Sequence, residues 1–162
     1  MSMALILPPV QPHRGFRSID AWGGGGFGAP RIKDGKNYPH KGLDCISVPG
    51  DTIIFPITAR VWPPHGQAYT DGSCDLRSIH LRGEHQHDGL RINLLYVKPS
   101  VLSDSHGKVG DPLGAAQDVA AYHQSHDPKR GPMTNHTHME LYILKDGVWQ
   151  LVDPGPYMAL SA

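Results

Sequence analysis

Residues 136–152 have the sequence HTHMELYILKDGVWQLV, which is typical of a β-hairpin. Two apolar-rich segments flank Lys145-Asp146-Gly147, and an Asp-Gly pair favours a tight turn between antiparallel strands. Side chains alternate between the faces of a strand, so Thr137 and every second residue up to Ile143 share one face, which is largely apolar. The opposite face carries His136, His138, Glu140 and Tyr142. The hairpin therefore predicts an antiparallel sheet with one face in a core and two histidines together on the other.

The rest of the chain also predicts short strands separated by turns. Apolar or β-branched segments at 52–57, 58–62, 76–82 and 90–97 are bounded by glycine, proline and polar residues. The 19 glycines and 15 prolines are spread along the chain, and residues 115–126 are compatible with a single helical turn. We expect an all-β fold: a compact, loop-rich antiparallel β-sheet domain of the sandwich or barrel type, with little helix.

The length of 162 residues fits one domain. We expect residues 1–20 to form an N-terminal arm or first strand, and residues 21–162 to form a single β domain. Basic and acidic residues number 15 each, so no net charge favours nucleic acid or a membrane surface as a partner. No apolar run approaches membrane-spanning length, and the patch at 3–7 is too short for a signal peptide. We expect a protein made in the cytoplasm without an export signal.

A second histidine motif, His40-Lys41-Gly42-Leu43-Asp44, lies far from the hairpin in sequence. Asp44 stands where a polar turn gives way to an apolar segment, and a carboxylate buried there needs a partner, which a metal ion would supply. Together with His40 and one hairpin histidine, Asp44 would give a metal ion three ligands and leave one coordination position open, as in catalytic zinc sites. The left-over histidine could handle protons beside the metal. Each motif alone is also compatible with a solvated loop or a surface strand, so the prediction depends on the two motifs meeting in space.

The remaining histidines and the two cysteines are less informative. The chain has 11 histidines, and we interpret most of them as solvated loop residues, His85 and His87 included. Cys45 and Cys74 belong to no Cys-x-x-Cys motif, which disfavours a metal role, while a disulfide and two free thiols both remain open.

The two histidine motifs and several segments around them occur in a characteristic order. The early motif extends to Tyr38-Pro39-His40-Lys41-Gly42-Leu43-Asp44, and the late one reads Asn135-His136-Thr137-His138-Met139-Glu140. The other segments are residues 27–31, 48–51, 54–56, 107–114 and 152–154. In this order they resemble the lysostaphin/LytM-type zinc metalloendopeptidases, from about residue 20 to residue 160. The ordered co-occurrence is far more specific than any single motif.

The resemblance implies a zinc peptidase whose β fold is a duplicated hybrid motif. By resemblance, His40, Asp44 and His138 would hold Zn²⁺, and His136 would be the catalytic histidine. The metal would activate a water molecule and polarise the scissile carbonyl, while His136 would orient or deprotonate that water or steady the oxyanion. The implied substrate is the peptide cross-links or stems of bacterial peptidoglycan. Without an export signal, such a protein would reach the cell wall after lysis or as a component of a larger particle.

The chain departs from the family pattern at one place. Active members carry a further histidine at a position that falls at Lys98 in this sequence. The ending Tyr96-Val97-Lys98-Pro99 instead resembles leukocyte cell-derived chemotaxin, a relative with the zinc fold that is not known for proteolysis. Another histidine could substitute, the candidates being His106, His123 and His126. Lys98 itself could also steady an oxyanion as a cation.

This departure leaves an alternative function open. The chain would then be a non-catalytic zinc-binding module of the same fold, in which zinc contributes folding energy. Such a module would bind a peptide, the cell wall or a partner protein, for example in a phage tail or an injection particle. A histidine-rich β domain without metal is a third interpretation.

Overall fold

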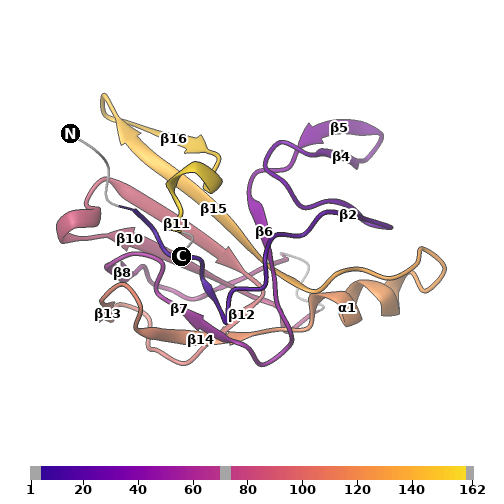
Figure 1. Ribbon diagram of the computed structural model, residues 1–162, viewed down its shortest axis with the longest axis horizontal. Coiled ribbons are helices and arrows are strands. Elements are labelled where there is room, and N and C mark those ends of the chain that lie inside the picture. Colours follow the sequence, from indigo (N-terminus) through magenta and orange to yellow (C-terminus); the bar gives the residue numbers. More distant parts are fainter. Residues whose placement is uncertain (1–4, 70–73, 160–162) are drawn as a thin grey trace.

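The computed structural model describes residues 5–69 and 74–159, and this part of the chain is mainly β structure (Figure 1). The larger sheet has eight strands: six follow the order β13-β8-β10-β11-β15-β16, β6 pairs with β15, and β9 pairs with β10. Its strands are β6 (Leu43–Ile46), β8 (Ala59–Val61), β9 (Gly66–Gln67), β10 (Arg77–Gly83), β11 (Leu90–Leu95), β13 (His106–Gly107), β15 (His136–Lys145) and β16 (Val148–Val152). All of these pairings are antiparallel, so the predicted all-β antiparallel fold is confirmed.

A second sheet and two hairpins complete the strands. The sheet has the order β1-β7-β14-β12, and the hairpins pair β2 with β3 and β4 with β5. The bounds are β1 (Val10–Gln11), β2 (Ile19–Asp20), β3 (Gly23–Gly24), β4 (Pro30–Lys33), β5 (Lys36–Pro39), β7 (Thr52–Ile54), β12 (Val97–Pro99) and β14 (Pro112–Ala116). The helical segments are η1 (His85–His87), α1 (Val119–His126) and η2 (Gly155–Tyr157). Within the described ranges, no helix is both long and apolar enough to cross a membrane.

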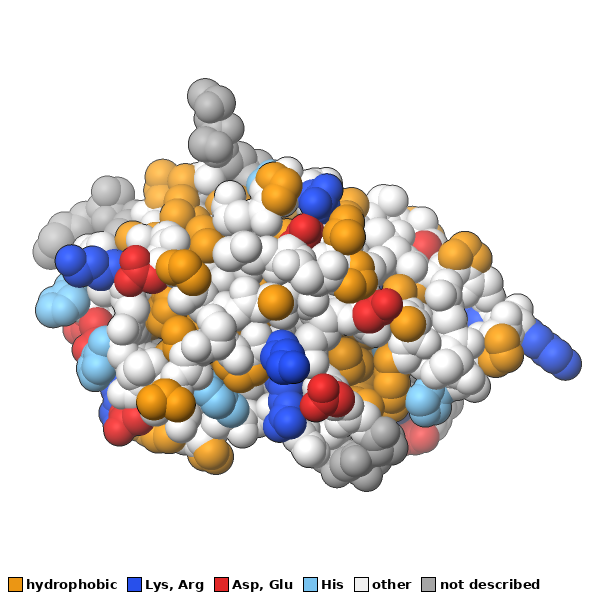
Figure 2. Space-filling model, turned by 90° about the horizontal axis from the view of Figure 1, so that it is seen from below, with side chains coloured by type: hydrophobic (Ala, Val, Ile, Leu, Met, Phe, Trp, Pro, Cys, Tyr) orange, Lys and Arg blue, Asp and Glu red, His pale blue; other side chains and the backbone are white. Residues whose placement is uncertain are grey.

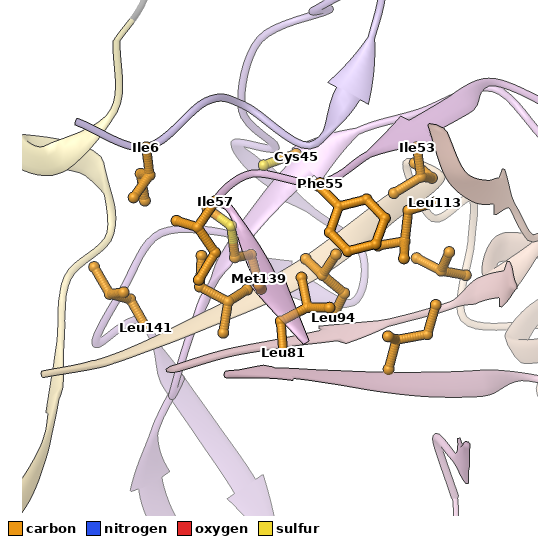
Figure 3. Close-up of a cluster of buried hydrophobic side chains, with 14 of the residues drawn as sticks. Ile6, Cys45, Ile53, Phe55, Ile57, Leu81, Leu94, Leu113, Met139 and Leu141 are labelled. Carbon is orange, nitrogen blue, oxygen red and sulfur yellow. The ribbon is translucent and has the colours of Figure 1, made fainter. Parts of the chain in front are cut away.

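The hydrophobic core draws side chains from both sheets (Figure 3). Ile53 and Leu113 come from the smaller sheet, and Leu94, Met139 and Leu141 come from the larger one; each is completely buried. Burial of a side chain of this size contributes roughly 1.5–3 kcal/mol. The last two lie on the apolar face predicted for the hairpin, and the polar face of β15 is therefore directed away from this core.

The N-terminal segment takes part in the same core. Ile6 and Val10 are completely buried members of it, and β1 pairs with β7. The backbone of Ile6 also bonds to the end of the described chain, where its N–H donates to the carbonyl of Tyr157 over 3.0 Å. The first described residues thus pack between the smaller sheet and η2.

Residues with positive φ mark two turns, one within the larger sheet and one between the two sheets. The β15–β16 hairpin turns at Asp146 and Gly147, with φ of 53° and 77°, which is the left-handed pair that the Asp-Gly sequence predicts. Tyr96 has φ of 71° and separates β11 from β12, which belongs to the other sheet. The expectation of one strand over 90–97 is wrong at this residue, because a left-handed residue cannot continue a strand.

Two minor expectations are also settled by the fold. His87 is buried rather than solvated, since η1 turns its ring inward, where Nδ1 accepts from the backbone N–H of Thr58 over 3.0 Å. His85 is exposed, as expected. Cys45 and Cys74 are free thiols, and burial, helped by the charge of Asp44, raises the pKa of Cys45.

Candidate metal centre

The two histidine motifs meet because β6 pairs with β15. In this register Asp44 lies directly opposite His138, which places their side chains at neighbouring positions on the same face. His40 precedes β6, and its ring lies next to the side chains of both Asp44 and His138. Between His40 and β6, Gly42 passes so close to β15 that an added Cβ would lie 2.4 Å from the carbonyl oxygen of Met139 and 2.7 Å from Cε1 of His138. Only glycine permits this approach, which explains the residue type at the middle of the early motif.

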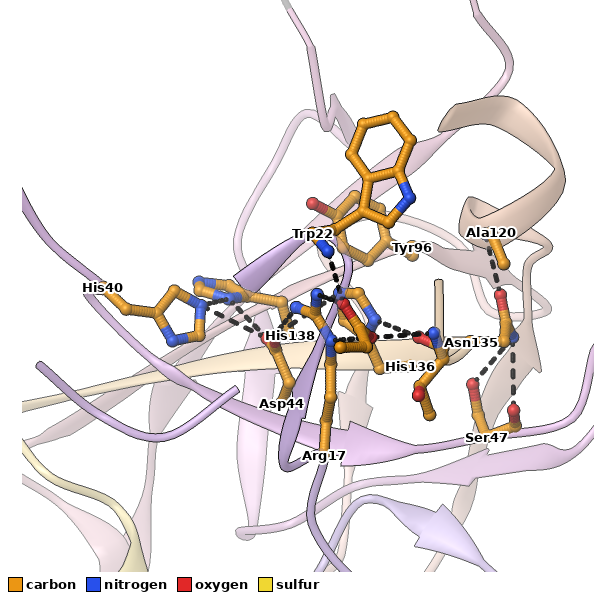
Figure 4. A network of polar contacts seen from close by, with 12 residues as sticks. Arg17, Trp22, His40, Asp44, Ser47, Tyr96, Ala120, Asn135, His136 and His138 are labelled. Atoms are coloured by element: carbon orange, nitrogen blue, oxygen red, sulfur yellow. Dashed lines mark hydrogen bonds and ion pairs between the residues drawn. The ribbon is translucent and has the colours of Figure 1, made fainter. Parts of the chain in front are cut away.

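Three side-chain atoms converge at this point (Figure 4). Oδ1 of Asp44 lies 3.0 Å from Nδ1 of His138 and 3.3 Å from Nε2 of His40. The two ring nitrogens are 3.0 Å apart. Two imidazoles and a carboxylate are the ligand types that zinc takes, with metal–ligand bonds of about 2.0–2.2 Å. The structure therefore brings together the three residues predicted as metal ligands.

The outward-facing nitrogens of both histidines are also engaged. Nδ1 of His40 donates to the carbonyl of Gly26 over 3.0 Å, and Nε2 of His138 lies 3.1 Å from Oε1 of Glu140. Glu140 is itself held by the hydroxyl of Tyr142, which donates over 2.9 Å. Histidine ligands commonly bond a carbonyl or carboxylate through the nitrogen that does not face the metal, because this fixes the ring and the tautomer. The donor set and its supporting contacts thus fit a zinc ion.

Charge is tightly coupled in the cluster. Burial alone would raise the pKa of Asp44, but hydrogen bonds from His138 and His40 and nearby positive charge hold it well below its usual range. Burial opposes the charged form of His138 as well, yet its bonds to Asp44 and Glu140 outweigh that cost and raise its pKa to about 9. Arg17 adds a further cation, since its Nη1 donates to Oδ2 of Asp44 over 2.9 Å. No sequence motif surrounds Arg17, so its contact with Asp44 was not predicted.

His136 lies beside these three residues rather than among them. Its Nε2 is 3.5 Å from Oδ2 of Asp44, and its Nδ1 is 2.8 Å from the carbonyl of Thr134, to which it can donate. Burial lowers the pKa of His136 and outweighs the opposing charge of Asp44, so the ring is neutral at pH 7. Asn135 fixes the start of this strand, accepting from the N–H of Ala120 in α1 over 3.1 Å and donating to the hydroxyl of Ser47 over 3.0 Å (Figure 4). A neutral imidazole that donates from Nδ1 has its lone pair at Nε2, where it can accept a proton.

A cavity of about 730 Å³ opens over the cluster. On one side it is lined by Tyr96, Tyr69 and His123. The hydroxyl of Tyr69 lies 2.9 Å from the hydroxyl of Tyr96 and 2.7 Å from Nε2 of His123. The ring of Tyr96 meets His136 edge-on, with 5.4 Å between centroids. Burial and surrounding positive charge lower the pKa of His123 to about 4.

These positions decide between the candidate substitutes for the missing histidine. Lys98 is exposed on β12 and does not line the cavity, so the idea that it steadies an oxyanion there is wrong. His106 is exposed and lies 2.6 Å from Glu84, and His126 is exposed at the end of α1. His123 is the candidate that borders the cavity. The residue next to His136 is Tyr96, because the chain turns there and not at Lys98.

Sequence comparison supports the family resemblance over part of the chain. No family model matches. Over 93 residues the chain is 33% identical to Myeloid protein 1 of Gallus gallus, an alignment that covers 54% of this chain and 25% of that protein. The matched region is thus about a quarter of the relative's length.

Solved structures match over most of the chain. Csd3 of Helicobacter pylori superposes with a TM-score of 0.64 and 16% identity, over 98% of this chain and 36% of that one. The catalytic domain of the antimicrobial peptidase lysostaphin from Staphylococcus simulans gives a TM-score of 0.57 and 17% identity, over 83% of this chain and 90% of that one. A zinc-containing peptidase from Vibrio cholerae gives a TM-score of 0.56 and 16% identity, over 91% of this chain and 39% of that one. The resemblance of the sequence to the lysostaphin/LytM-type family is thereby confirmed at the level of structure, and the chain has the fold of these peptidases.

Proposed function

We propose that the chain is a zinc-dependent metalloendopeptidase that hydrolyses peptide bonds of bacterial peptidoglycan. The observation that carries this proposal is the convergence of His40, Asp44 and His138 beneath a cavity, with a neutral histidine, His136, at its edge. A purely structural zinc site is usually closed by four protein ligands, whereas three ligands under an open cavity suit catalysis. The peptidases that share the fold support the reaction class, and the sequence resemblance supports the substrate.

The residues of the site have separable roles in this proposal. His40, Asp44 and His138 would hold Zn²⁺, which when bound lowers the pKa of a water molecule and polarises a carbonyl. His136 accepts the proton of the attacking water at Nε2, because the carbonyl of Thr134 keeps Nδ1 protonated and burial keeps the ring neutral. Arg17 holds the carboxylate of Asp44 in place through Oδ2, the oxygen that does not face His40 and His138.

Mass spectrometry of soluble fragments tests this proposal. Purified peptidoglycan is incubated with the zinc-loaded protein, with its His136→Ala variant and with a His126→Ala control, whose histidine is exposed outside the cavity. The wild type and the control should release peptide fragments that identify the bond, and His136→Ala should release far fewer, since general-base groups typically contribute about 10²–10⁴ in rate. Equal release by His136→Ala would contradict its role.

The alternative function remains a non-catalytic zinc-binding module on the same fold. The specific observation that favours it is that the ring meeting His136 edge-on is the phenol of Tyr96, while the imidazole of His123 on the same wall contacts the hydroxyl of Tyr69. In this case the protein would bind peptidoglycan peptides without releasing fragments, for example as a component of a phage tail or injection particle. Either function would be exercised outside the cytoplasm, where the proposed substrate lies.

A further inference from the structure

Basic side chains gather around the cavity over the candidate metal position. The cationic residues in its lining are Arg17, Arg31, Lys33, Lys41 and Arg130, and the acidic ones are Asp44 and Glu140. The chain as a whole has 15 basic and 15 acidic residues, and on the face shown in Figure 2 the two kinds are interspersed. The cavity lining therefore has an excess of basic over acidic residues, although the two kinds are equal in number over the whole chain.

Both carboxylates of the cavity are already engaged. Asp44 accepts from Arg17 through one oxygen and faces the two ligand histidines through the other. Glu140 accepts from the hydroxyl of Tyr142 over 2.9 Å and contacts Nε2 of His138 over 3.1 Å. Both carboxylates therefore have closer partners than the cations nearer the opening of the cavity.

The outer cations lie on two walls. The β4–β5 hairpin and α1 project from the same end of the larger sheet, with β2 between them (Figure 1). Arg31 and Lys33 belong to β4, Lys41 follows β5, and Arg130 follows α1, where its guanidinium lies 4.3 Å from the centroid of the Trp22 ring. Among the residues that the structure describes, these cations form no ion pair except a long contact between Nη2 of Arg31 and Oδ2 of Asp44, at 3.9 Å.

We propose that the cavity takes a peptide with a free carboxylate close to the bond presented to the metal, and that Arg31 binds this carboxylate. The proposal rests on the proposed function for the peptide and its bond. The Arg31 side chain is 16% exposed and lies beside Asp44, so an anion bound to it would sit next to the metal ligands. A guanidinium can hold a carboxylate with two parallel hydrogen bonds, which a lysine cannot. Lys33 and Lys41 are exposed on the same wall and would attract the anionic peptide.

A pair of matched peptides tests this inference. The two share a peptidoglycan stem sequence and differ in one group, the α-carboxylate of a D-glutamate residue or its primary amide. Isothermal titration calorimetry measures their binding to the zinc-loaded full chain. We expect the acid to bind about tenfold more tightly than the amide, as for one charge-assisted contact. Arg31→Gln should remove most of this difference.

A control on the same hairpin separates specific binding from general attraction. Lys36 pairs with Lys33 in the β4–β5 register and is exposed, but it does not line the cavity, so Lys36→Gln should keep the tenfold preference. Equal affinities for acid and amide in the wild type would overturn the proposal. An equal loss in Lys36→Gln and Arg31→Gln would also overturn it, as would failure of the acid to bind at millimolar concentration.

Cleavage of the same peptides, followed by mass spectrometry, distinguishes this inference from the proposed function. Discrimination between acid and amide without cleavage would contradict the peptidase and leave the carboxylate site in place. Cleavage of both peptides with equal affinity would contradict only the carboxylate site.

Discussion

Arg17 donates from Nη1 to Oδ2 of Asp44 over 2.9 Å, and the two side chains are only 3% and 1% exposed. The other carboxylate oxygen of Asp44 faces His40 and His138. One oxygen of Asp44 thus has a permanent cationic partner, and the other is directed to the candidate metal position. The carboxylate remains compensated whether or not a metal ion is bound, and the ligand geometry can persist without metal.

Replacement of Arg17 by Met should therefore destabilise the metal-free protein more than the zinc-bound protein. Removing one partner of a buried ion pair costs about 3–5 kcal/mol, because the remaining charge is left uncompensated. Zinc would supply positive charge at the same carboxylate and reduce this loss. Urea unfolding in EDTA and in excess zinc measures both values. The control is Arg14→Gln, which breaks the surface ion pair with Asp51 and should change the free energy of unfolding little in either condition. Equal losses of stability in Arg17→Met with and without zinc would show that zinc does not compensate the charge of Asp44.

The hairpin was the part of the fold most accessible from sequence. Alternation along a strand depends only on local order, so the position of His136 and His138 on one face, and of Met139 and Leu141 on the other, followed from the residue pattern. The apolar surroundings of Asp44 likewise predicted that its carboxylate needed a partner. The meeting of the two motifs in one ligand cluster was expected from the family resemblance rather than from either motif alone, and the pairing of β6 with β15 that produces it was not predicted.

The parts that were missed depend on long-range geometry. Arg17 meets Asp44 across 27 positions of sequence, and nothing in its neighbours marks it as an ion-pair partner. The turn at Tyr96 interrupts an apolar run whose residue pattern predicts a single strand. The pattern therefore did not predict that the ring of Tyr96 would contact His136. Tyr69 and His123 lie 54 positions apart in sequence and meet because α1 places His123 on the same wall of the cavity.

The pKa of His138 predicts opposite effects of pH on stability and on zinc binding. In the metal-free protein this pKa is about 9, against an ordinary value of 6.5, so the folded chain binds the proton more tightly than the unfolded chain does. The resulting stabilisation, at most about 3 kcal/mol, is complete below pH 6.5 and is lost as the pH rises through 9. Unfolding in EDTA should therefore become easier over that interval.

Zinc must displace the same proton, so its affinity should increase over the same pH interval. Calorimetric titration of zinc at several pH values, together with urea unfolding in EDTA, checks both trends. In His138→Gln the pH dependence of metal-free stability should largely disappear, while His126→Gln should retain it. A metal-free protein whose stability is constant from pH 6.5 to 9 would show that His138 does not hold this proton.

Substitution of Gly42 by Ala should disturb the metal site, because Gly42 lies between His40 and Asp44 in the sequence and packs against His138. The new Cβ would lie 2.4 Å from the carbonyl oxygen of Met139 and 2.8 Å from Nε2 of His138, so β6 and β15 must separate or the imidazole must move. Overpacking of this kind costs about 1–3 kcal/mol, and displacement of a ligand should also weaken zinc binding. Gly26→Ala is the matched control, because Gly26 has no atom within 4 Å of its added Cβ and holds His40 through its backbone carbonyl. Similar zinc affinities for the two variants would contradict the close approach.

Removal of the Tyr69 hydroxyl should cost more than removal of the Tyr96 hydroxyl. Tyr96 is 8% exposed and its hydroxyl bonds to Tyr69, so Tyr69→Phe leaves a buried polar group without that partner, at about 1–3 kcal/mol. Tyr96→Phe leaves the Tyr69 hydroxyl still bonded to His123 over 2.7 Å. The double variant should then be less destabilised than the sum of the single variants, because it contains no orphaned hydroxyl. Urea unfolding of all four proteins measures this coupling. Strict additivity would mean that the two hydroxyls do not depend on each other, and the wall of the cavity would have to be held by packing of the rings alone.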